Sequence, residues 1–483
     1  MLSSYVKRRS FLALLCGAGT LGALEGGCHA WRYVLGHPTI ELAQWPPMPK
    51  GPNVTRIVCL GESTTYGTPW GNELAWPAML EHLLHRLAPQ REWQVLNAGV
   101  AGADSSDMLR ILDQGGNFQA DLLIVFAGNN TFYREFLEAT FFPGLRIDHG
   151  EVQRSLLLLP NAPRKVRQVL RFIDAPEIGI SGLLPRFLQY QREVDPQRLI
   201  KRLTDAVGLI SQRCNELGTP MLVATQPVNV LSWLPFVSDP QSAPQWADQL
   251  LQTCSALADG HAAQAGSIAE QALQKFNEPL LLQSAGIAAW DQGELSRATS
   301  LLLEALDRDV NRFRGTPSLW RGLLAKAHQL DVPSLDLAGQ YYDQLAAGRI
   351  EDEIFLDLVH YTLPGAMWIA REMLRGISDL GLVQGIAAQQ IEEMGIATEL
   401  EEFAGKSCGN VLGGLQSALE LPRVFEQFQI VEQICKLAAQ HSPPADWAKP
   451  TLDELRAQRP GFTALGQLTR RIPLPLIPAR YGL

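Results

Sequence analysis

The chain has 483 residues, of which 46% are hydrophobic and 19% are charged, and its net charge at pH 7 is −9. This length allows two or three globular domains, and the acidic balance argues against general nucleic-acid binding. The seven cysteines lack CxxC spacing, so they give no zinc or redox motif.

The N-terminal segment has the pattern of an export signal. Arg8 and Arg9 precede an apolar run at 11–24, which has about the length of a signal-peptide core and is short for a membrane span. The segment resembles a twin-arginine signal, so we expect the protein on the periplasmic or extracytoplasmic side. Cleavage after Ala30, lipidation of Cys28 and an uncleaved membrane anchor are the alternatives, beside an amphipathic helix of a cytoplasmic protein.

Apolar runs alternate with helical periodicity along much of the chain. Strands are expected at 56–60, 93–100, 121–127, 220–224 and 332–337. Helices are expected at 78–87, from Ser105 or Ser106 as cap to about 112, at 199–217, at 318–330 with Ser318 as cap, and at 366–373. This alternation predicts a parallel α/β sheet.

The segment 241–310 is alanine-rich and helical in pattern, and it contains an internal repeat. Four positions recur after 33 residues, namely Gly260, Ala265, Ala272 and Leu273 as Gly293, Ala298, Ala305 and Leu306. The second unit resembles a tetratricopeptide repeat. Because two units are too few to stand alone, we expect them to pack on the α/β domain and to offer a surface for a protein partner.

Several polar or glycine positions follow the expected strands, at the edge where a parallel sheet binds ligands. Ser63, Gly102 and Asn130 follow the first three strands, and Asp357 and His360 follow the fifth. Acyl transfer to a serine needs a base, an acid that orients the base, and donors for the oxyanion. These residues could supply all three, although Ser63 read alone could equally be a helix cap.

The motifs around these residues resemble the SGNH hydrolases of the GDSL esterase/lipase superfamily. The matching blocks, in order, are Gly61-Glu62-Ser63 with Glu for the usual Asp, Asn97 to Gly102, Gly128-Asn129-Asn130, and Asp357-Leu358-Val359-His360. The resemblance implies a flavodoxin-like, three-layer α/β/α fold with about five parallel strands. It implies Ser63 as nucleophile, His360 as base and Asp357 as its orienter. The implied oxyanion donors are the Ser63 and Gly102 N–H groups and the Asn130 side chain, with Asn129 as a competitor.

The expected organisation has six parts. They are a signal peptide or anchor at 1–35, a proline-rich linker at 36–52, the first part of the hydrolase domain at 53–240, the helical insertion at 241–310, the last part of the hydrolase domain at 311–378, and a helical C-terminal extension at 379–483.

The expected function is cleavage of a carboxylic ester, in an acylated small molecule or glycan, through an acyl-enzyme on Ser63, with no metal or cofactor implied. One alternative is O-acetyl transfer to an envelope polysaccharide by the same triad. The other is a non-catalytic scaffold that binds a partner through its repeats. The presence of Ser63, Asp357 and His360 together counts against a scaffold.

Overall fold

The structure is a computed structural model. It describes residues 49–132 without 69 and 115–117, residues 194–231, 235 and 238, residues 245–350 without 311 and 313, residues 354–399 without 357, 382, 384, 385 and 397, and residue 403. The expected leader at 1–35 and most of the expected C-terminal extension lie outside the described residues.

The described part of the chain contains a five-stranded parallel sheet with the order β2-β1-β3-β4-β5. The strands are β1 (Val54–Gly61), β2 (Glu92–Gly99), β3 (Leu122–Phe126), β4 (Met221–Ala224) and β5 (Ser334–Leu335). All residues of β3 and β4 are buried, as expected for strands covered on both faces. The flavodoxin-like order confirms the predicted fold class and places the switch point between β1 and β3. The fifth strand is shorter than the expected 332–337.

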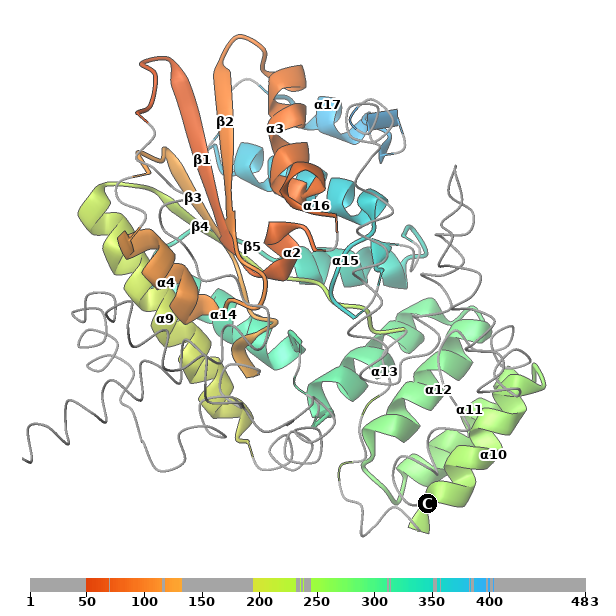
Figure 1. The fold of residues 1–483 in the computed structure, drawn as a ribbon. Helices are drawn as coiled ribbons and strands as arrows, with labels where there is room; N and C mark the ends of the chain where they lie inside the picture. The colour runs from red at the N-terminus through yellow and green to blue at the C-terminus, as the bar shows by residue number, and fades with distance from the viewer. Residues whose placement is uncertain are drawn as a thin grey trace, which may run out of the picture. The chain divides into compact units, whose positions relative to one another are not determined.

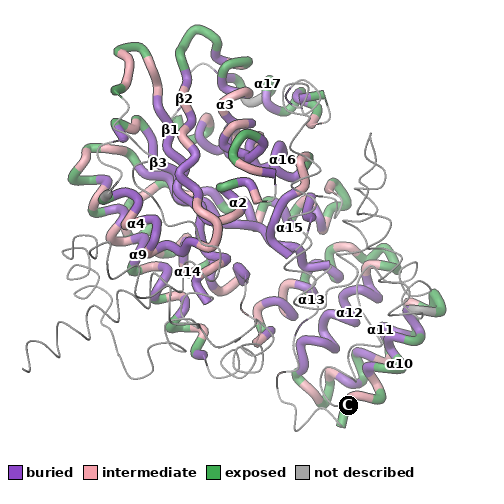
Figure 2. The backbone as a smooth tube through the Cα atoms, in the orientation of Figure 1, coloured by how far each residue is buried: buried purple, intermediate pink, exposed green. Residues whose placement is uncertain are grey.

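Helices cover both faces of this sheet (Figure 1). On one side lie α3 (Trp76–Leu87), α15 (Leu337–Ala346), α16 (Leu363–Asp379) and α17 (Ala388–Glu392), and on the other α4 (Ser105–Gln114), α9 (Pro196–Leu217) and α14 (Pro317–Gln329). Burial is concentrated along the strands and on the helix faces turned toward them (Figure 2). α15 has no counterpart among the expected helices, and α16 is longer than the expected 366–373. Among the described helices, none has the length and apolar character of a membrane span.

Two of the predicted helix caps are wrong. In α4 the cap is Asp104, whose Oδ1 accepts the N–H of Ser106 at 2.9 Å, while Ser105 already begins the helix. In α14 the cap is Thr316, and Ser318 lies inside the first turn. A capping side chain belongs to the residue before the first helical one, because from there it reaches the unpaired N–H groups of the first turn.

The segment 245–310 forms a stack of helices in which each packs on the next. They are α10 (Ala247–Ala258), α11 (Ala262–Leu273), α12 (Pro279–Asp291) and α13 (Leu295–Arg308). The repeated glycines occupy equivalent turns, with φ of 77° at Gly260 and 78° at Gly293. α13 also contacts α14 and α15, so the stack packs on the α/β domain as expected. Membership of the tetratricopeptide family stays a prediction.

Candidate active site

Ser63 and His360 meet at the carboxyl edge of the sheet. Ser63 is the first residue of the short helix α2 (Ser63–Tyr66), which follows β1 directly. The His360 Nε2 lies 2.8 Å from the Ser63 Oγ, although 297 residues separate them in the chain. This distance is suitable for a base that removes the serine proton. The third predicted member of the triad, Asp357, lies outside the described residues.

Two other loops hold the backbone around His360. The Trp70 Nε1 donates to the carbonyl of Tyr361 at 2.8 Å. After β4, the N–H of Asn229 donates to the carbonyl of Leu358 at 2.8 Å. Since these bonds lie one and two residues from His360, they restrict where the imidazole can sit. Asn229 thus supports the site through its backbone.

The predicted oxyanion donors lie after the first three strands. Gly102 has a φ of 73°, a conformation that favours glycine. Among the described residues, neither the Gly102 N–H nor the Ser63 N–H donates to an acceptor. The Asn130 Nδ2 donates to the carbonyl of Ala103 at 2.8 Å, next to Gly102. An amide nitrogen carries two hydrogens, so this bond leaves one for a ligand.

The structure separates the roles of Asn129 and Asn130. Asn129 is buried, and its Oδ1 accepts the N–H of Gly315 at 2.7 Å. Its Nδ2 has no exposed surface. Asn130 is half-buried and so less enclosed than Asn129. The geometry therefore favours Asn130 as the oxyanion donor over Asn129.

Glu62, directly before Ser63, holds the loop that carries Asn130. Its Oε1 accepts the N–H of Gly128 at 3.0 Å, and its Oε2 accepts those of Asn129 and Asn130 at 3.0 and 3.2 Å. Glu62 is fully buried. Burial raises its pKa to about 8, because the loss of hydration outweighs these three bonds, and the carboxylate of Asp104 adds to the rise.

A buried ion pair holds the segment that follows Gly102. The Arg202 Nη2, on α9, lies 2.8 Å from the Asp104 Oδ2, and both side chains are buried. Sequence reasoning did not single out Arg202, and it noted Glu62 only as a replacement for the usual Asp. The spacing of α9 could have indicated Arg202. This charged residue lies four residues before Ala206 and therefore on the same, buried face of the helix.

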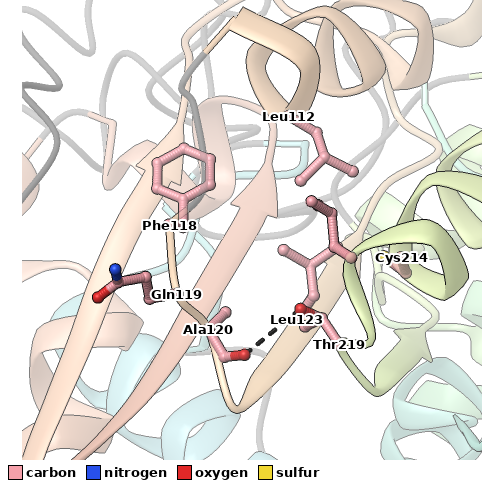
Figure 3. Close-up of a pocket in the computed structure, with 8 residues that line it drawn as sticks. Leu112, Phe118, Gln119, Ala120, Leu123, Cys214 and Thr219 are labelled. Carbon is pink, nitrogen blue, oxygen red and sulfur yellow. Dashed lines mark hydrogen bonds between the residues drawn. The ribbon is translucent and has the colours of Figure 1, made fainter. Parts of the chain in front are cut away.

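A small pocket lies away from Ser63 and His360 (Figure 3). Its lining is mainly apolar and includes Leu112, Phe118, Leu123 and Cys214. Leu123 is near the start of β3, so the pocket lies toward the amino edge of the sheet, opposite Ser63. Burial raises the pKa of the Cys214 thiol to about 11, which leaves it unreactive at neutral pH. Within the described ranges, no cluster of three His, Cys, Asp or Glu side chains could hold a metal ion.

Comparison with known families gives a match over part of the chain. Residues 59–265 match the model of the GDSL-like Lipase/Acylhydrolase family. The match includes Ser63, Gly102 and Asn130 and ends before His360. It confirms the prediction of an ester-hydrolysing enzyme.

Comparisons with curated proteins and with solved structures give weaker similarities or none. A search of curated proteins finds no match. Among solved structures, an acetylxylan esterase from Geobacillus stearothermophilus, Axe2, is 10% identical, with 69% of this chain and 97% of that chain covered at a TM-score of 0.32. LAE5, an alpha/beta hydrolase enzyme from the metagenome of Lake Arreo, Spain, is 13% identical, with 68% and 96% covered at a TM-score of 0.32.

Proposed function

We propose that the protein is a serine hydrolase of the SGNH type, which cleaves a carboxylic ester through an acyl-enzyme on Ser63. The observation that carries the proposal is the 2.8 Å contact between the Ser63 Oγ and the His360 Nε2. It lies at the edge of the sheet where parallel α/β folds bind ligands. The oxyanion donors predicted from the sequence gather around the same edge.

In the first half of the reaction, His360 takes the proton of the Ser63 hydroxyl as its oxygen attacks the ester carbonyl. The developing oxyanion accepts hydrogen bonds from the N–H groups of Ser63 and Gly102 and from the Asn130 side chain. As the intermediate collapses, the protonated His360 gives its proton to the leaving alcohol, and the acyl group stays on Ser63. Asp357 has the role of orienting the imidazole.

In the second half, His360 takes a proton from water, whose oxygen attacks the acyl carbonyl. The same donors stabilise the second oxyanion. Collapse returns the proton from His360 to the Ser63 oxygen and releases the carboxylic acid. The cycle needs no group beyond the residues of this chain and water.

A fluorophosphonate probe tests the proposal, because it reacts with an activated serine whatever the natural substrate. We expect labelling of the full-length protein, loss of labelling in Ser63→Ala, and normal labelling in Ser267→Ala, a control on the surface of α11. His360→Ala should slow labelling by at least about 10³-fold. A folded wild-type protein that stays unlabelled would refute an activated Ser63.

A further inference from the structure

The residues that leave the helical insertion touch the loop that carries Asn130. We define the exit segment as residues 309–316, between α13 and α14, and the oxyanion loop as residues 128–130. The N–H of Gly315 donates to the Asn129 Oδ1 at 2.7 Å, across 186 residues of sequence. Both residues are buried. The contact therefore joins the segment that follows the helical insertion to the predicted catalytic site.

This contact requires a glycine at 315. A Cβ there would lie 2.6 Å from the Trp320 Nε1 and 3.2 Å from the Asn129 Oδ1. A larger residue would push one of these groups away. Among the described residues the Asn129 Nδ2 has no hydrogen-bond partner, so the Gly315 N–H is the group that orients this amide.

An ion pair lies within the exit segment, and hydrogen bonds join the two helices that flank it. The Arg314 Nη2 lies 3.0 Å from the Asp309 Oδ2, and both side chains are buried. Asp307, in the last turn of α13, accepts the N–H of Ser318 at 2.8 Å and its hydroxyl at 2.7 Å. Ser318 lies in the first turn of α14. Gly315 therefore lies between two helices, α13 and α14, that are hydrogen-bonded to each other.

The oxyanion loop is held on its other side by the nucleophile region. The N–H groups of Asn129 and Asn130 both donate to the carboxyl group of Glu62, the residue before Ser63. Asn129 is thus the junction between two anchors, since its backbone is tied to Glu62 and its side chain is tied to Gly315. Its neighbour Asn130 is the predicted oxyanion donor.

We propose that Asn129 and Gly315 are positioning residues through which the helical insertion sets the place of Asn130 in the oxyanion hole. The inference rests on the proposed function of Ser63 and Asn130. By this proposal the insertion contributes to the geometry of the hydrolase site. Donor placement matters because misplacing a catalytic group by about 1 Å can lower a rate by about 10²-fold.

The test measures the rate of fluorophosphonate labelling, and kcat and KM for p-nitrophenyl acetate, on full-length proteins. Asn129→Ala and Gly315→Ala should lower kcat and the labelling rate by about 10- to 100-fold with KM little changed. Asn129→Asp keeps an acceptor oxygen for Gly315 and should be faster than Asn129→Ala. The control is Gly322→Ala in α14, whose Cβ would lie 2.5 Å from the Ile200 Cγ2, a comparable clash between α14 and α9. It should retain the wild-type rate.

The outcomes separate this inference from the proposed function. Wild-type rates in Asn129→Ala, with labelling still lost in Ser63→Ala, would overturn the inference and leave the proposed function standing. Unlabelled, folded wild-type protein would overturn both. If Asn129→Asp were as slow as Asn129→Ala, the acceptor oxygen for Gly315 would not be what sets the place of Asn130, and the inference would be overturned. If Gly322→Ala were as slow as Gly315→Ala, the effect would be general destabilisation. Circular dichroism shows which variants fold. If Gly315→Ala does not fold, the test rests on Asn129→Ala.

Discussion

Replacing Glu62 with glutamine should change how the stability of the protein depends on pH. Glu62 is fully buried beside the nucleophile and binds three backbone N–H groups of the oxyanion loop. Its pKa is raised from the ordinary 4.5 to about 8, mainly by burial. The folded protein therefore keeps this proton up to about pH 8, whereas the unfolded chain loses it near pH 4.5.

The sign and size of the effect follow from proton linkage. Between these two pH values the folded state binds one proton more than the unfolded state, so the free energy of unfolding falls as the pH rises. The contribution of Glu62 is fully present below pH 4.5 and is lost by the time the pH passes about 8. The difference between 4.5 and about 8 corresponds to about 5 kcal/mol.

Glu62→Gln removes the titratable group, but it also removes one hydrogen bond to the oxyanion loop. The glutamine oxygen can keep the bonds from Asn129 and Asn130, but its NH₂ group would face the N–H of Gly128. One unpaired buried N–H costs about 1–3 kcal/mol. We therefore expect the variant to be less stable than the wild type at pH 5 and more stable at pH 9.

Urea unfolding of both proteins at several pH values from 5 to 9 measures this difference. Glu278, whose pKa burial raises to about 7, titrates in the same range, but it does so in both proteins and cancels in the comparison. Glu92→Gln, at the exposed start of β2, is the matched control and should run parallel to the wild type. Parallel curves for the wild type and Glu62→Gln would refute the reasoning.

Two further substitutions test the supports of the site. Trp70→Phe removes the bond to the carbonyl of Tyr361 beside His360. It should lower kcat for p-nitrophenyl acetate several-fold at constant KM and cost about 1–2 kcal/mol in urea unfolding, and an effect on KM alone would contradict this role. Arg202→Met leaves the carboxylate of Asp104 buried without its cation and should cost about 3–5 kcal/mol. Adding Asp104→Asn should recover part of that loss in thermal denaturation, and a double variant no more stable than the single one would show that the pair is not the cause.

The strands and most helices could be predicted because their signals are local. The apolar run of β3 and the periodicity of α9 depend on neighbouring residues alone. The sequence did not predict α15, because this helix contains Gly339 and two tyrosines, which are weak helix formers. It is stabilised by distant residues, since Tyr341 packs edge-on against Phe355 and Trp368.

The sequence by itself determined which residues could do chemistry, because Ser63, Gly102, Asn130 and His360 each follow an expected strand. It could not show that His360 reaches Ser63 across 297 residues, because only the folded chain brings the segment before α16 to the end of β1. Tertiary structure is needed even more to find the supporting roles of Glu62, Arg202 and Gly315. A buried charge or a glycine indicates that a partner or a close approach is needed, but only the packing of distant elements decides which residue meets it.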